Sequence, residues 1–452
     1  ADKIYDVERI RRKGGEIDAK NLALELDDIN NRIMELQEAL KTEKDLELIS
    51  IYTAEEIIDD LRGALESVYN FYNGYDPLFS WWIPVPYKNI DSSLANYSIE
   101  FTKKLDSPQY KQDNSGIVGK PVGKEELINR LRYNFIPYDP EELIEIAKKE
   151  LARSQKEMLK ASAEMGYGDN WKAASEEVKQ TYVKPGDQPQ LIMRLFDESI
   201  AFIEKHDLLT ISPLAKEVWG IKMMSPERQL VSPFFLGGTS IIVSYPTNTM
   251  EIDDRMMSMR GNNPHFSRAT VHHESIAGHH YQFFMNNRSR TYRRFGTPFW
   301  HEGNALYWEF LLYEMGFPQS PEDRIGMLFW RMHRSARIIF SLNYHLGNWT
   351  PQQCIDFLVD RVNFERANAE AEVRRSFATN YSPLYQLAYM VGGLQFYALK
   401  NEVVDNGDMS LKEYHDTILE LNAMPVEMLR AILINQDLDE DFKTNWRFYE
   451  TR

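Results

Sequence analysis

The chain has 452 residues, 43% of them hydrophobic and 27% charged, which suits one large or two packed domains and argues against wholesale disorder. Asp and Glu number 68 against 52 Lys and Arg, for a net charge of −16, and no basic stretch interleaved with aromatics interrupts this acidity. Such a surface repels phosphate backbones, so we expect no nucleic-acid partner, and no apolar run approaches the roughly 18 residues of a membrane span.

Helical periodicity runs from about residue 17 to 70, where leucines and isoleucines recur every three or four positions. We expect a packed pair of antiparallel helices there, in preference to an intermolecular coiled coil. Asn73-Gly74 and Asp76-Pro77 then break the pattern. Residues 80–87 contain two tryptophans and two prolines, and proline is excluded from central strands. This segment is expected to be an ordered loop that inserts its aromatic rings into a core.

The rest of the chain predicts more helices and little strand. Asp139-Pro140-Glu141-Glu142 is a strong helix start, with a capping residue, a proline in the first position and acids in the first turn. We predict helices from there towards Gly166, over 188–206, and from about 321 to the C-terminus, with a strand over 239–245. The expected fold is mainly α, with a small β-sheet beside the active-site helix. It forms a single domain, with an N-terminal helical part to about 185 and a catalytic part from 186.

The single cysteine, Cys354, rules out an intrachain disulfide and a cysteine-rich metal cluster. It lies in an amphipathic helical pattern that predicts a buried, unreactive thiol. Residues 1–452 contain no signal-peptide pattern, so the compartment is not directly readable from them.

Four of the ten histidines fall between positions 272 and 280. Imidazole is the commonest zinc ligand, and a His-Glu pair on a helix opens the site of many metallohydrolases. His273 and His279 are six residues apart, which on an ideal helix means about 240° of rotation and 9 Å of rise. An undistorted helix cannot bring them to one ion, but Ala277-Gly278 permits a bulge or break. We therefore expect a metal site with His273 and His279 as ligands, and with His280 as the alternative to His279.

A carboxylate on a second helix commonly completes a site of this two-histidine kind. Glu302 follows His273 by 29 residues, which leaves room for a helix, a loop and a return. We predict Glu302 as the third ligand. Glu309, two turns further on, is the alternative ligand or a hydrogen-bond partner for one imidazole.

These motifs resemble a known family. His273-Glu274-x-x-x-Gly278-His279-His280, followed by Glu302-Gly303-x-Ala305-Leu306-Tyr307-x-Glu309, is similar to the bacterial "domain of unknown function 885". The resemblance implies a helix-rich protein of the kind suspected to be a zinc metallopeptidase. Its architecture would be similar to the gluzincin group of thimet oligopeptidase and angiotensin-converting enzyme. It also implies a periplasmic or extracellular location, with a lipid anchor before processing.

If the resemblance holds, the cofactor is Zn²⁺ and the substrate is a peptide or a small amide. The metal would lower the pKa of a bound water from about 15.7 towards 7. Glu274 is the expected general base, and Tyr389, then His345, is the expected donor to the oxyanion. Two alternatives stay open: a metal-dependent amidase or lyase acting on a small non-peptide metabolite, and a non-catalytic protein that keeps the metal for binding.

Overall fold

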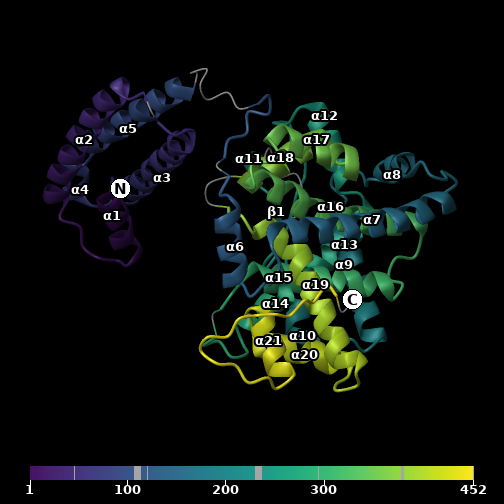
Figure 1. The fold of residues 1–452 in the computed structure, drawn as a ribbon. Helices are drawn as coiled ribbons and strands as arrows, with labels where there is room; N and C mark the ends of the chain where they lie inside the picture. The colour runs from purple at the N-terminus through teal and green to yellow at the C-terminus, as the bar shows by residue number, and fades with distance from the viewer. Residues whose placement is uncertain are drawn as a thin grey trace. The chain divides into compact units, whose positions relative to one another are not determined.

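The computed structural model describes residues 1–44, 46–105, 113–119, 121–229, 237–293, 295–377 and 381–450. The described residues form a mainly helical protein with one small parallel sheet (Figure 1). The chain divides into two compact units, residues 1–120 (unit 1) and residues 121–452 (unit 2). The sequence pattern predicts an internal division near residue 185. The contacts place it near 120, because the helices between these positions pack on the later ones: residues 140–164 on residues 321–345, and residues 188–205 on residues 264–274.

Unit 1 is built from helices alone within its described residues (Figure 1). The expected antiparallel pair becomes part of a larger set, in which α5 packs on both α2 and α3 around a leucine- and isoleucine-rich core. Its helices are α1 (Asp2–Arg12), α2 (Ala19–Thr42), α3 (Leu48–Tyr72), α4 (Pro77–Trp82) and α5 (Pro84–Leu105).

The expectation of an aromatic loop over residues 80–87 is wrong, because this segment is helical. Asp76 caps α4 by accepting hydrogen bonds from the backbone N–H groups of Leu78 and Phe79. Pro77 and Pro84 stand at the first positions of their helices, where the missing N–H would have had no partner anyway. Trp81 is 79% exposed, so it does not plug a core of unit 1.

Unit 2 confirms the predicted helices near 140–166 and 188–206, the run of helices after 321, and the position of the strand. The strand β2 pairs in parallel with β1, with Ile221 opposite Ile241. The elements of unit 2 are α6 (Lys124–Tyr133), α7 (Pro140–Glu164), α8 (Trp171–Lys179), α9 (Gln188–Lys205), α10 (Pro213–Glu217), β1 (Ile221–Met223), α11 (Pro226–Gln229), β2 (Ile241–Val243), α12 (Ile252–Gly261), α13 (Pro264–Glu274), α14 (His279–Asn286), α15 (Pro298–Glu314), α16 (Pro321–His345), α17 (Pro351–Val362), α18 (Arg366–Phe377), α19 (Tyr385–Lys400), the π-helix η2 (Asn401–Asp405), α20 (Leu411–Leu421) and α21 (Val426–Leu433).

Three long helices form the centre of unit 2. Most residues of α15, α16 and α19 are buried, so these helices are enclosed by the rest of unit 2, and they also bury charged side chains such as Glu302 and Arg337. Glycines let α15 and α19 approach closely, since a Cβ on Gly303 would lie 2.5 Å from the Cα of Gly392. The packing fixes α19 beside the part of α15 that carries Glu302. Cys354 is buried in α17, as predicted.

Candidate metal centre

The histidine segment is not one helix. α13 ends at Glu274 and α14 begins at His279, and the connection between them contains Ser275 outside helical geometry and a cis peptide bond between Ile276 and Ala277. A Cβ on Gly278 would lie 1.7 Å from the carbonyl oxygen of His273, so only glycine fits there. The helix break predicted at Ala277-Gly278 is therefore confirmed.

The break brings two imidazoles together. The rings of His273 and His279 lie edge to face with centroids 4.9 Å apart. Glu302 of α15 meets both: its Oε2 lies 3.3 Å from Nε2 of His273 and 3.2 Å from Nε2 of His279. In a tetrahedral zinc centre with bonds of about 2.0–2.1 Å, neighbouring ligand atoms lie about 3.3 Å apart. The distance from Glu302 to each imidazole thus matches the spacing between neighbouring zinc ligands.

The electrostatics favour a positive charge at this place. Burial acts to lower the pKa of His279, but Glu302 and Glu274 outweigh it and raise this pKa to about 9. Burial acts in the opposite direction on Glu302, where the two histidines hold the pKa well below its usual range. The pKa of His273 is likewise raised, since Glu302 and Glu309 overcome its burial. A cation is the natural occupant of a pocket in which carboxylates outnumber imidazoles.

The imidazoles of His273 and His279 are each oriented by a hydrogen-bond partner on Nδ1. Nδ1 of His273 lies 2.7 Å from Glu309 Oε1, and Nδ1 of His279 lies 3.2 Å from Gln282 Oε1. Gln282 is fixed in turn, because its amide donates to the carbonyl oxygen of His301. Such contacts leave Nε2 of each ring pointing at the shared position. Of the two roles considered for Glu309, the geometry supports the partner rather than the ligand. Sequence reasoning missed Gln282 as a partner of His279. Its position one turn after His279 on α14 was the available signal.

Glu274 stands beside the two histidines. One oxygen of its carboxylate lies 4.0 Å from Nε2 of His279, and the same oxygen, Oε2, is buried without a hydrogen-bond partner among the described residues. His273, Glu274 and His279 can each offer a ligand atom within 4.8 Å of the others. The backbone of Gly237 lies against this carboxylate, since a Cβ there would be 1.7 Å from Oε2. Glu274 can thus face a metal-site water or act as a further ligand.

The structure separates the remaining candidates. His280 is not part of the cluster, because its Nε2 bonds to the carbonyl oxygen of Ala215 at 2.8 Å. His345 is not brought there either: its ring contacts Tyr344 and Phe377, and burial with nearby Arg130 lowers its pKa to about 4. Tyr389 does lie at the site, with its ring stacked on that of His273 at 6.1 Å.

Tyr385 is a site residue that sequence reasoning missed. Its hydroxyl donates a hydrogen bond to Oε1 of Glu302, the oxygen that faces away from the two histidines. Tyr385 and Tyr389 are four residues apart on α19, so both rings lie on one helix face. This spacing was the available signal. Tyr389, burial and Glu302 raise the pKa of Tyr385 above its usual value, so its hydroxyl stays protonated.

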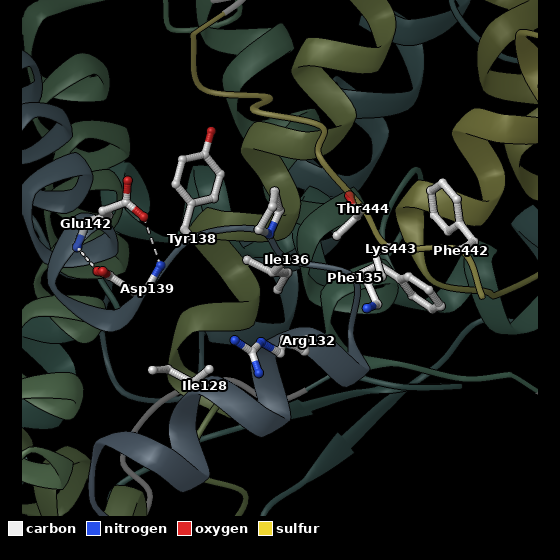
Figure 2. Close-up of a pocket in the computed structure, with 11 residues that line it drawn as sticks. Ile128, Arg132, Phe135, Ile136, Tyr138, Asp139, Glu142, Phe442, Lys443 and Thr444 are labelled. Carbon is white, nitrogen blue, oxygen red and sulfur yellow. Dashed lines mark hydrogen bonds between the residues drawn. The ribbon is translucent and has the colours of Figure 1, made fainter.

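A cavity of about 430 Å³ opens beside the cluster and includes His279, Glu302 and Tyr385 in its lining. A second cavity of about 820 Å³ lies between the α6–α7 connection and residues 442–444 (Figure 2). The two share no lining residue. Of these two cavities, the first is the one that borders the candidate ligands.

Residues 18–433 match the family described as "Bacterial protein of unknown function (DUF885)". The chain belongs to this family. No curated protein matches the sequence. The fold is similar to that of a candidate lipoprotein of unknown function from Shewanella oneidensis, with a TM-score of 0.69, 19% identity, and coverage of 90% of this chain and 78% of that one. It is also similar to a candidate lipoprotein from Colwellia psychrerythraea, with a TM-score of 0.63, 18% identity, and coverage of 83% and 66%. Among the described helices, none has the length and hydropathy of a membrane span.

Proposed function

We propose that this DUF885 protein is a zinc-dependent hydrolase of peptide or amide bonds. The observation that carries the proposal is that Nε2 of His273 and Nε2 of His279 lie 3.3 and 3.2 Å from the same oxygen of Glu302, beside an oxygen of Glu274 that has no hydrogen-bond partner among the described residues. Two imidazoles and a carboxylate are a common zinc donor set in hydrolases. Zinc, when bound, would supply Lewis acidity and lower the pKa of a water.

The chain's own residues would handle the proton and the developing charge. Glu274 has a buried carboxylate oxygen free to accept a proton from the attacking water and to return it to the leaving nitrogen. The hydroxyl of Tyr389 is the candidate donor to the oxyanion, and burial is the main influence that keeps its pKa raised, whereas the hydroxyl proton of Tyr385 is already donated to Glu302. Glu309 and Gln282 would hold the imidazoles in their binding orientation.

The strand β2 favours a peptide over a small metabolite as the substrate. Within the described residues β2 pairs only with β1, which leaves its other edge for an extended chain. It begins shortly after Gly237, the residue whose backbone lies against Glu274. A peptide added to this edge would therefore run close to the proposed base.

An exported location is part of the same proposal. The similar solved structures are described as candidate lipoproteins. Fractionation of the producing bacterium with an antibody to this chain tests it, and recovery in the cytosolic fraction alone would contradict it.

The decisive experiment combines metal analysis with a peptide library, on protein purified without a histidine tag. We expect about one zinc per chain and cleavage of some peptides. Glu274→Gln should keep the zinc and lower kcat by about 10²- to 10⁴-fold, the usual contribution of a general base. A folded wild type that takes up no zinc, or unchanged cleavage by Glu274→Gln, would contradict the mechanism. Turnover of small amides with every peptide intact would support the metabolite alternative. Bound zinc with neither activity would support a binding protein.

A further inference from the structure

The cavity beside the candidate metal centre has a distinctive wall. Phe283 of α14 and His301 of α15 stack with ring centroids 5.7 Å apart and an interplanar angle of 24°. Pro298 adds a third flat, largely apolar surface to the same lining. Two rings and a pyrrolidine form a surface against which a planar or branched apolar group packs well.

Glycines keep the cavity open. Gly237, Gly238 and Gly296 all belong to the lining and contribute no side chain. A Cβ on Gly296 would lie 3.5 Å from Nε2 of His301, which is an ordinary van der Waals distance. A larger side chain at position 296 would therefore grow into the cavity instead of clashing with the backbone. The volume of about 430 Å³ falls within the range of cavities that hold small ligands.

The lining holds little charge of its own. Its acidic and basic side chains are Glu302, His279 and His301. Glu302 and His279 point toward each other at the candidate metal position, while His301 stacks on Phe283. Among the residues that the structure describes, the lining contains no Lys, Arg or Asp. Burying an unpaired charge is costly, and the charges of Glu302 and His279 are engaged with each other at the candidate metal position, so a charged substrate side chain packed against Phe283 and His301 would have no counter-ion among the described lining residues.

We infer that this cavity receives an uncharged aromatic or branched aliphatic side chain of the substrate, next to the bond that is cleaved. The inference rests on the proposed function, because the cavity opens on His279 and Glu302. It adds the substrate class: peptides with an apolar residue such as Phe or Leu beside the scissile bond.

The first arm of the test is a set of peptides that differ only in the residue beside the cleaved bond: Phe, Leu, Ala, Lys or Glu. We expect kcat/KM for Phe and Leu to exceed that for Ala by at least about tenfold, as an apolar pocket discriminates, with Lys and Glu lowest. Equal kcat/KM across the set would overturn the inference while leaving the hydrolase proposal standing.

The second arm uses variants. Phe283→Ala should reduce the preference for Phe over Ala at least fivefold, because it removes one ring of the wall. Gly296→Leu should reduce it by filling the cavity, and serves if Phe283→Ala fails to fold. The matched control is Phe442→Ala, a half-buried aromatic that lines the other cavity and contacts Phe135 (Figure 2). An effect of the same size in the control would overturn the inference.

The third arm measures binding without catalysis. Titration calorimetry of the full chain compares N-acetylphenylalaninamide, N-acetylalaninamide and N-acetyllysinamide. We expect only the first to bind measurably, and its affinity to fall at least fivefold in Phe283→Ala and not in Phe442→Ala. This pattern in a protein that cleaves no peptide would uphold the cavity and refute the hydrolase. Equal binding of the Phe and Lys amides would overturn the inference whether or not peptides are cleaved.

Discussion

His279 and His333 are both buried in unit 2, yet their environments shift their pKa values in opposite directions. Burial lowers the pKa of both, but around His279 the carboxylates of Glu302 and Glu274 reverse the effect and raise it to about 9. Around His333, Arg337 adds to the effect of burial, and the pKa falls to about 3 despite Glu372. The sign of the surrounding charge, rather than burial, distinguishes the two.

The carboxylates nearest these two histidines, Glu302 and Glu372, also differ in the charges that surround them. Glu372 is saturated by cations and donors: Arg337 Nε at 2.6 Å, Arg375 Nε at 3.1 Å and Gln386 Nε2 at 2.9 Å. Glu302 instead faces two imidazoles whose Nε2 atoms could bind a metal after losing their protons to solvent. A buried cluster of ionisable groups thus becomes a candidate metal site only where lone pairs converge and negative charge is in excess.

The largest expected effect comes from removing one carboxylate charge at each place, Glu302 near His279 and Glu372 near His333. Glu302→Gln should abolish zinc binding, because it removes a ligand and the excess negative charge. Glu372→Gln should keep the zinc, but lower the free energy of unfolding by about 3 kcal/mol, since it leaves buried arginines unpaired. Metal analysis and denaturant unfolding of both variants test the comparison. Zinc lost equally from both would show that the two regions do not differ as argued.

The next effect concerns the break between α13 and α14, which brings His273 and His279 together. Gly278→Ala places a Cβ 1.7 Å from the carbonyl oxygen of His273, so the backbone must move and separate the two imidazoles. We expect zinc binding to be lost and the free energy of unfolding to fall by about 3 kcal/mol. Gly296→Ala is the matched control, with an expected change within about 0.5 kcal/mol. Retention of zinc by Gly278→Ala would contradict the need for this geometry.

A smaller effect is expected from the partner of His273. Glu309→Gln keeps the shape of the side chain but removes the charge that orients and polarises the imidazole. Zinc affinity, measured by competition with a chelator, should weaken about 10- to 100-fold. Glu314→Gln, at the end of the same helix, should leave it unchanged. An unaltered affinity in Glu309→Gln would mean that the contact of 2.7 Å is not functional.

The smallest expected effect is the pH dependence of stability that the buried His333 produces. The folded-state pKa of His333 is about 3, below the usual 6.5, so the unfolded chain binds its proton first. The stability that neutral His333 contributes is complete above pH 6.5 and is lost as the pH falls towards 3. Between pH 7 and 5, the metal-free wild type should lose about 2 kcal/mol more than His333→Phe in urea unfolding. Parallel pH profiles would refute the shift.

Much of the fold was predictable where local chemistry decides it. Asp139 and Glu142 form a capping box around Pro140, and the helix that follows ends within two residues of the predicted Gly166. Over residues 80–87 the predicted loop is wrong: the tryptophans and prolines suggest a loop, but Asp76 and the positions of the prolines favour helix starts. Local rules thus located most helices. Whether an aromatic residue fills a core depends on its solvent exposure, which only the structure gives.

The candidate site divides along the same line. The sequence by itself determined the donor types, the glycine that permits the break, and the set of His273, His279 and Glu302, because these depend on residue identity and spacing. Only the tertiary structure chose His279 over His280, placed Glu309 on Nδ1 of His273, left His345 out and brought in Tyr385. Those outcomes depend on the directions in which separate helices present their side chains. Such directions are fixed by packing contacts, including the close approach of α15 and α19, between residues far apart in the chain.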